Sequence, residues 1–282
     1  MKNNGKERDT QTKLNLLAQF FKQIVRIFDG QETGQSFDPG PRFAPLEEAE
    51  IHFGPWAPDA GDHESHLPVA QEKIIVMGAS FGGVPALTSI LEKFPENCPP
   101  TLIVQHMPAA AMRASASRLN KECRPEVRIA RAGDAPRAGL VLVAPGDAHM
   151  VLRRGPHGLT IRLFEGLPVH NQRPSVDMLF HSAAKAAGEN AVGILLTGMG
   201  EDGALGLSQL RRAGAHTIAQ DRATAAMHGM PGAAIALGAA SRVLPLERIA
   251  PAALALARGI SSPAQRLVPI PADATRRFAA AN

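Results

Sequence analysis

The sequence contains no tyrosine, and aromatic residues make up only 4% of its 282 residues. Proteins that bind single-stranded nucleic acid stack bases on aromatic side chains, so we expect no nucleic-acid partner. There are only two cysteines, Cys98 and Cys123, and they are too far apart for a Cys-x-x-Cys motif. The sequence therefore predicts neither a disulfide framework nor a thiolate metal site. Such sparse cysteine use is typical of a reducing compartment, and we predict a cytoplasmic location.

Long hydrophobic runs are also missing. No apolar stretch approaches the roughly 18–20 residues that a membrane-spanning helix needs, so no integral membrane segment is expected. The polar start of the chain, Met1–Thr12, does not have the pattern of a signal peptide. The net charge is only +4, and the Lys and Arg residues are scattered, which favours a solvated surface. Apolar residues make up 45% of the chain, enough for a sizeable core.

The pattern along the chain predicts three parts. Residues 1–72 form an N-terminal extension, with an amphipathic helix at about 13–29 followed by a linker rich in Pro, Gly and acidic residues. This helix is expected to dock on its own domain, to bind a partner helix or to lie on a membrane surface. Residues 73–260 form the main domain, and residues 261–282 form a proline-containing tail.

Within the main domain, strand and helix patterns alternate. Buried strands are expected at Lys73–Met77, Thr101–Gln105, Leu140–Ala144, Ala191–Thr197 and His216–Gln220, and helices at Val84–Lys93, Ser175–Ala187 and Ala204–Ala213. This alternation predicts an α/β fold, a doubly wound and mostly parallel sheet with helices on both faces. The stretch Val127–Phe164 has short strand-like runs between turn residues, and we expect an antiparallel hairpin region there.

The first predicted strand runs directly into Gly78-Ala79-Ser80-Phe81-Gly82-Gly83, and a helix follows. A Gly-x-Ser-x-Gly sequence at a strand–turn–helix is the nucleophile elbow of serine hydrolases. The following helix directs its N–H groups at a developing oxyanion, and the amide of Phe81 is the first candidate donor. A dinucleotide-binding turn is the alternative, but it needs an acidic residue after the second strand, where the sequence has Val104-Gln105-His106.

Two further residues complete a candidate triad. His106 follows the second strand, and Asp202 follows the strand that ends in a Gly-rich loop, so both are expected at the same sheet edge as Ser80. His106 is the candidate base, and Asp202 the candidate acid that orients it. The alternatives are a structural histidine, an Asp202 that caps the next helix, and Glu201 as the orienting acid. The chain order Ser, His, Asp differs from that of familiar hydrolases, so spacing alone leaves these alternatives open.

For the remaining acidic residues and histidines, the sequence gives weaker evidence of a functional role. Five other histidines have no metal-ligand spacing with Cys or carboxylates, so neither a metal site nor a cofactor is predicted: His149, His170, His181, His216 and His228. Asp177 lies in the first turn of a helix that Ser175 is expected to cap, which favours a structural role. Asp221 ends a strand and is a weaker candidate for lining the site.

Several sequence blocks resemble the catalytic domain of the chemotaxis receptor methylesterases, the CheB family. In chain order they are Met77–Gly83, Val104–Pro108, Ala144–Met150, Arg173–Phe180, Leu196–Ala204, Ala219–Asp221 and Gly229–Pro231. The resemblance implies a doubly wound parallel sheet with Ser80 as nucleophile, His106 as base and Asp202 as orienting acid. It also implies that Met199 lines the site and supplies an oxyanion N–H. The implied reaction is hydrolysis of glutamyl methyl esters on the cytoplasmic helices of methyl-accepting chemoreceptors, with glutamine deamidation as a related activity.

Two departures from the family pattern affect these expectations. Phe81 stands where the family often has Thr, which makes the mouth of the site bulkier and puts substrate fit in question. The residues before Lys73 lack the acidic pair, phospho-acceptor Asp and Lys of a receiver domain, so we expect no control by phosphorylation in cis. A general serine esterase on the same fold and a non-catalytic signalling or binding module remain alternative functions.

Overall fold

The computed structural model describes residues 73–259. The predictions for residues 1–72, including the helix at 13–29, and for the tail at 261–282 lie outside the described residues. None of the helices within the described range combines the length and hydrophobicity that a membrane span requires.

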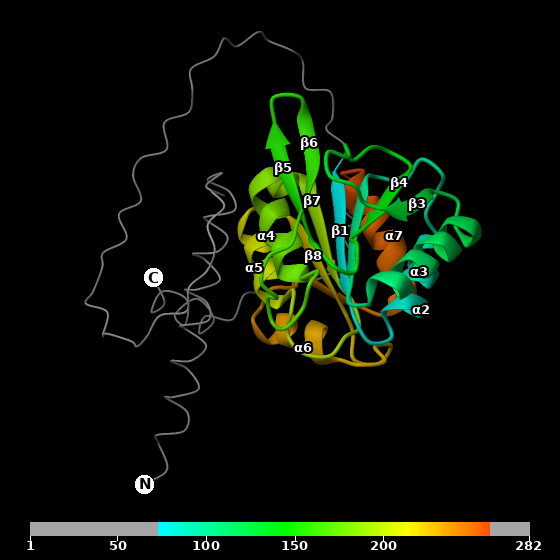
Figure 1. The fold of residues 1–282 in the computed structure, drawn as a ribbon. Coiled ribbons are helices and arrows are strands. Elements are labelled where there is room, and N and C mark those ends of the chain that lie inside the picture. Colours follow the sequence, from blue (N-terminus) through cyan, green and yellow to red (C-terminus); the bar gives the residue numbers. More distant parts are fainter. Residues whose placement is uncertain (1–72, 260–282) are drawn as a thin grey trace, which may run out of the picture. The chain divides into compact units, whose positions relative to one another are not determined.

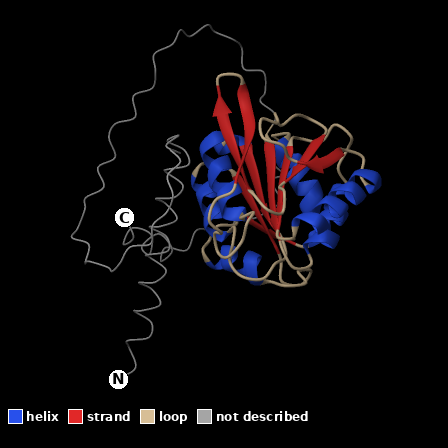
Figure 2. Cartoon of the chain, in the orientation of Figure 1, coloured by secondary structure: helices blue, strands red, loops and turns tan. Residues whose placement is uncertain are grey.

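A seven-stranded parallel sheet forms the centre of the domain, in the order β3-β4-β2-β1-β7-β8-β9 (Figures 1 and 2). Its strands are β1 (Ile74–Ala79), β2 (Thr101–Gln105), β3 (Glu126–Ile129), β4 (Leu140–Val143), β7 (Ala191–Leu195), β8 (His216–Gln220) and β9 (Arg242–Leu244). The central strands are buried on both faces, as parallel sheets covered by helices are. The predicted α/β fold with a parallel sheet is therefore confirmed.

Helices cover both faces of the sheet (Figure 1). They are α2 (Gly83–Leu91), α3 (Ala109–Glu122), α4 (Val176–Ala186), α5 (Ala204–Arg212), α6 (Gly229–Ala236) and α7 (Leu246–Ala257), with a short 3-10 turn at Gly188–Asn190. Alternate residues of β1 point to opposite faces: Ile74 and Val76 pack with α4, α5 and α6, whereas Ile75 and Met77 pack with α2, α3 and α7. Two hydrophobic cores result, one on each side of the sheet.

The stretch Val127–Phe164 differs in part from the prediction. An antiparallel hairpin is present, formed by β5 (His149–Gly155) and β6 (Gly158–Phe164). However, β3 and β4 belong to the main sheet and pair in parallel, so the expected hairpin region is smaller than predicted. Between β3 and β4 the chain leaves the sheet and bonds to Ile161 of β6 before it returns. This detour allows two strands close in sequence to run in the same direction, which a tight hairpin turn cannot do.

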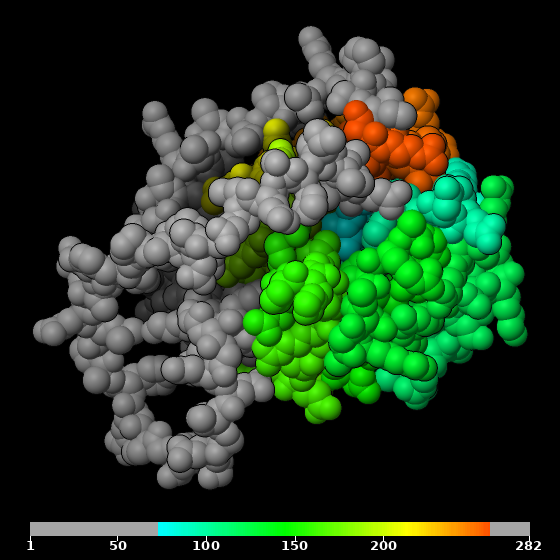
Figure 3. Space-filling model, turned by 90° about the horizontal axis from the view of Figure 1, so that it is seen from above, coloured from blue at the N-terminus to red at the C-terminus, as the bar shows by residue number. Residues whose placement is uncertain are grey.

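The carboxyl ends of β1, β2 and β7 meet at one edge of the sheet. β1 enters from the top of Figure 1 and runs downward, so this edge, with its loops and α6, lies in the lower part of that view. Figure 3 is seen from above and looks onto the opposite edge, where mid-chain residues, coloured green, form much of the visible coloured surface. In open parallel sheets, ligand sites lie at the carboxyl edge.

Candidate active site

Ser80 lies in the turn between β1 and α2. Its amide donates to Thr197 O at 3.0 Å, and its carbonyl oxygen accepts from Gln105 Nε2 at 2.8 Å. The turn needs a residue in the left-handed region at position 82, and Gly82 supplies it with φ 74°. Neighbouring strands thus hold the Ser80 backbone from both sides, and α2 begins three residues later with its N-terminus at the turn.

The loop after β7 approaches Ser80 closely. A Cβ built on Gly198 would lie 2.8 Å from Ser80 Cβ and 2.1 Å from Met230 Sδ, so only glycine fits there. Thr197 fixes the surrounding loops, because its hydroxyl donates to Phe81 O at 2.9 Å and accepts from the amide of Met227 at 2.9 Å. The segments that carry Ser80, Thr197 and Met227 are therefore joined into one unit.

His106 and Asp202 form the pair that the sequence predicted. His106 Nε2 donates to Asp202 Oδ2 at 2.8 Å, and the His106 amide donates to Ala79 O at 3.0 Å, next to Ser80. The other ring nitrogen, Nδ1, is buried and has no hydrogen-bond partner among residues 73–259. With its proton on Nε2, the imidazole keeps a lone pair on Nδ1, which is what a general base requires.

The Asp202 carboxylate accepts four hydrogen bonds. Oδ2 accepts from His106 Nε2 and the Val176 amide, and Oδ1 accepts from Ser175 Oγ and the Asp177 amide, at 2.8–3.0 Å. Burial by itself would raise the pKa of Asp202, but the hydrogen bonds from His106 and from these amides lower it below its usual range. Asp202 is therefore held as a carboxylate beside the imidazole.

The two alternatives for Asp202 do not fit this geometry. The N-cap of its own helix α5 is Gly203, and Asp202 instead binds the first amides of α4, whose N-cap is Ser175 as predicted. This arrangement places a negative charge at the N-terminus of α4, which stabilises both the charge and the helix. The side chain of Glu201 is 60% exposed and lies 3.9 Å from His170, whereas His106 is bound by Asp202.

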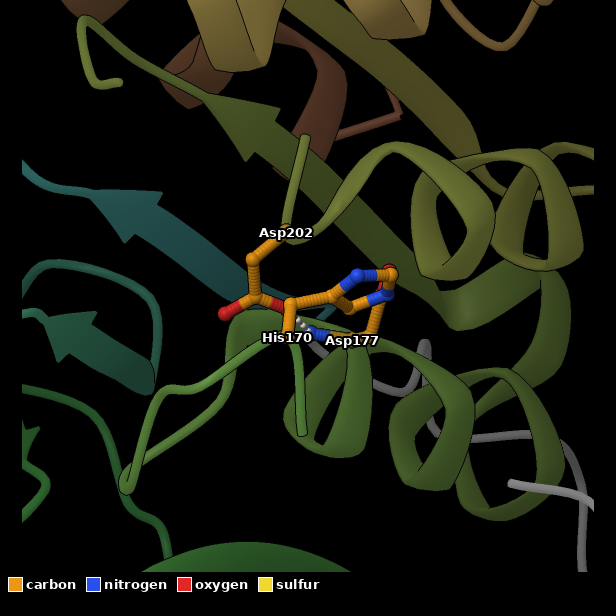
Figure 4. A group of neighbouring side chains, drawn as sticks. All are labelled: His170, Asp177 and Asp202. Atoms are coloured by element: carbon orange, nitrogen blue, oxygen red, sulfur yellow. Dashed lines mark hydrogen bonds and ion pairs between the residues drawn. The ribbon is translucent and has the colours of Figure 1, made fainter. Parts of the chain in front are cut away.

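A second acid–base pair lies beside Asp202 (Figure 4). His170 Nε2 is 3.1 Å from Asp177 Oδ2, and both side chains converge with Asp202 so that their ligand atoms lie within 4.8 Å of one another. Burial raises the pKa of Asp177 to about 6, and the hydrogen bond with Asp177 raises the pKa of His170. His170 is positioned by its left-handed backbone, φ 50°, in the turn that Val169 and Gln172 close.

This cluster does not fit a metal ion. Both oxygens of Asp202 already accept two hydrogen bonds each, and Asp177 Oδ1 accepts from the Gly206 amide at 2.7 Å. The lone pairs that remain belong to two residues, Asp177 and His170, whereas a zinc site takes three or four protein ligands. The geometry instead describes an ion pair that compensates a buried carboxylate.

Large apolar side chains surround the candidate site. Within the described part of the chain, the exposed large hydrophobic residues are Phe81 (63% exposed), Leu167 (73%), Met199 (70%) and Met227 (38%), all on loops at or near this edge. Phe81 and Met227 are joined through Thr197, and Met199 follows Gly198, whose amide donates to Met227 O. No hydrogen bond within residues 73–259 uses the amide of Phe81 or Met199, so both amides are available to an oxyanion.

The structure thus brings Ser80, His106, Asp202, Phe81 and Met199 to one edge of the sheet. Asp221, the weaker candidate, is used in a local turn, where its carboxylate accepts from the amide and hydroxyl of Thr224. The sequence pattern did not indicate that His149, His170 or Ser175 lie around Asp202. His170 and Ser175 lie in the loop between β6 and α4, which has no periodic signal that could have placed it, and His149 is the first residue of β5.

An open α/β sheet with a serine at a strand–turn–helix elbow and a His–Asp pair at the same edge defines the architecture of a serine hydrolase. Residues 75–253 match the family model described as CheB methylesterase, and the chain belongs to this family.

Individual relatives agree with this assignment. The chain is 53% identical over 186 residues to protein-glutamate methylesterase/protein-glutamine glutaminase 1 of Anaeromyxobacter dehalogenans, covering 66% of this chain and 53% of that protein. It is 45% identical over 236 residues to the protein numbered 5 of the same organism, covering 83% and 65%. The crystal structure of the Thermotoga maritima CheB methylesterase catalytic domain is similar with a TM-score of 0.65 and 34% identity, over 66% of this chain and all of that one. The chain spans about half to two thirds of the length of these curated relatives.

Proposed function

We propose that this protein is a serine hydrolase that removes methyl groups from glutamyl methyl esters on chemoreceptors. The observation that carries the proposal is the state of His106: Asp202 fixes one ring nitrogen, and the other is buried and has no hydrogen-bond partner among the described residues 73–259. The His106 amide binds Ala79 O, the residue before Ser80. Family membership and the names of the relatives support the substrate class.

The reaction proceeds in two steps. Ser80 Oγ attacks the ester carbonyl carbon while its proton passes to His106 Nδ1. The amides of Phe81 and Met199 hold the oxyanion, and Asp202 stabilises the imidazolium. His106 then protonates the leaving oxygen, the carbon–oxygen bond breaks and methanol departs. Water, activated by the same imidazole, attacks the glutamyl-enzyme and restores Ser80.

The surface around the site supports a macromolecular substrate. An exposed rim formed by Phe81, Met199 and Met227 is more apolar than a site for a small polar ester requires, and contiguous exposed apolar residues mark interaction surfaces. The receptor helices are the partner that the family implies. A glutamine side chain has the same carbonyl and a poorer leaving group, so deamidation with release of ammonia is a second reaction of the same site.

The decisive experiment compares Ser80→Ala with wild type. We expect Ser80→Ala to abolish methanol release from methylated receptor membranes. Its thermal unfolding midpoint should change no more than it does for a typical surface substitution. Ser89→Ala on helix α2 is the matched control, and it should keep full turnover. Residual methanol release by Ser80→Ala would refute the nucleophile.

Two further outcomes would separate the alternative functions. Turnover of small esters without turnover of methylated receptor would indicate a general esterase. If wild-type Ser80 does not react with a serine-directed phosphonate, the chain is a non-catalytic binding module.

A further inference from the structure

A buried histidine outside the triad connects the hairpin to the helix that holds Asp202. His149 is the first residue of β5 and is 1% exposed, with its ring 5.2 Å from that of Phe164. Both of its nitrogens are used: Nε2 donates to Leu167 O at 3.0 Å, and Nδ1 accepts from the Ser175 amide at 3.2 Å. These two bonds require the neutral ring with its proton on Nε2, because a second proton would face the Ser175 N–H.

Ser175 carries this constraint to the candidate triad. Its amide is held by His149, and its hydroxyl donates to Asp202 Oδ1 at 2.8 Å. The next two amides, of Val176 and Asp177, also donate to Asp202. Three of the four donors to the Asp202 carboxylate therefore come from one short segment, and His149 fixes the residue at which that segment begins.

We propose that His149 is a positioning residue: through Ser175 it holds the Asp202 carboxylate in the orientation that fixes the imidazole of His106. The inference rests on the proposed hydrolase function, but it concerns a residue that does not touch substrate. Burial lowers the pKa of His149, which favours the same neutral form. A shift of about 1 Å in a catalytic group can cost about 10²-fold in rate, so a loosened Ser175 has a measurable effect.

Two replacements separate the two hydrogen bonds of His149. An asparagine places its amide oxygen at about the position of Nδ1, so His149→Asn keeps an acceptor for the Ser175 amide and loses the donor to Leu167. A glutamine places its amide nitrogen at about the position of Nε2, so His149→Gln keeps the donor to Leu167 and loses the acceptor for Ser175. If His149 only stabilises the loop, each replacement should lower kcat only as far as it lowers the stability of the protein.

Three measurements on the full chain carry the test. These are kcat and KM on a chromogenic small ester, the thermal unfolding midpoint, and the downfield proton NMR signal of the His106 Nε2–H that is bound to Asp202. We expect His149→Gln to lower kcat by about 10²-fold with KM little changed, and to shift or broaden the signal. His149→Asn should retain most of kcat and a signal at the wild-type position.

The opposite pattern would overturn the proposal. If both variants lose kcat in parallel with their unfolding midpoints while the NMR signal stays in place, His149 only braces the loop. Should His149→Gln not fold, Ser175→Ala provides the second test, since it removes the hydroxyl that contacts Asp202 and leaves the His149–Ser175 bond. Its NMR signal must then move, and a wild-type signal with wild-type kcat would refute the link. The NMR comparison does not require turnover. A chain without esterase activity would therefore refute the proposed function, while the NMR signal would still test the role of His149.

Discussion

Replacing Asp202 by asparagine changes one atom of the candidate triad. It disturbs two of the four hydrogen bonds that the Asp202 carboxylate accepts. The asparagine oxygen can replace Oδ1 and still accept from Ser175 Oγ and the Asp177 amide. The amide nitrogen then occupies the place of Oδ2, where it faces the donors of Val176 and His106. His106 can accept from this nitrogen only if its proton moves from Nε2 to Nδ1. The lone pair that should take the Ser80 proton is then lost.

The size of both effects follows from this geometry. Loss of the correct tautomer in a Ser/His/Asp triad costs about 10⁴-fold in turnover, or roughly 5 kcal/mol of transition-state stabilisation. The Val176 amide is left buried against another donor, which costs about 1–3 kcal/mol of folding free energy. We therefore expect Asp202→Asn to remain folded, with a lower unfolding midpoint and with turnover near the limit of detection.

Methanol release from methylated receptor and hydrolysis of a small ester measure the effect on turnover, and urea unfolding measures the effect on stability. Asp221→Asn is a matched control, because Asp221 follows a neighbouring strand but binds only its local turn through Oδ1, which asparagine retains. It should change turnover by no more than about twofold. If Asp202→Asn keeps turnover within about tenfold of wild type, the tautomer argument is wrong and Asp202 is only a cap of helix α4.

Three other predictions concern the surroundings of the triad. Phe81→Thr keeps the backbone amide but removes an exposed ring, so kcat/KM on methylated receptor should fall by about tenfold while turnover of a small ester is unchanged; equal losses on both would contradict a docking role. In Gly83→Ala the new Cβ would lie 2.0 Å from Gln105 Oε1, and urea unfolding should show a loss of about 1–3 kcal/mol; wild-type stability would show that Gln105 can move freely. His170 has a raised pKa, so the stabilisation from its charge is lost as the pH rises through that pKa; below about pH 6 Asp177 becomes protonated, and the ion pair weakens there as well. The stability gap between wild type and His170→Gln should therefore narrow above neutral pH, and a gap that widens would refute the ion pair with Asp177.

Much of the fold followed from local sequence. The strands at Thr101–Gln105 and His216–Gln220 have the predicted bounds, because short apolar runs between turn residues specify buried strands directly. The Ser80 turn was also predictable from the sequence, because glycines on both sides of a serine after a strand allow a tight strand–turn–helix connection. Parallel pairing of β3 with β4 was not predicted, because their direction depends on a detour through β6 that no short-range pattern encodes.

The candidate triad itself was predictable as a set of residues at one sheet edge, because parallel strands must place their carboxyl ends together. The sequence determined that Ser80, His106 and Asp202 follow three such strands. Only the tertiary structure decided what Asp202 does there. Its carboxylate binds the N-terminus of a helix that begins 26 residues earlier in the chain. The Ser175 hydroxyl reaches it from the loop before that helix, and His149 of the hairpin binds the Ser175 amide. Hydrogen bonds between such distant segments depend on how the elements pack in three dimensions, which sequence spacing does not record.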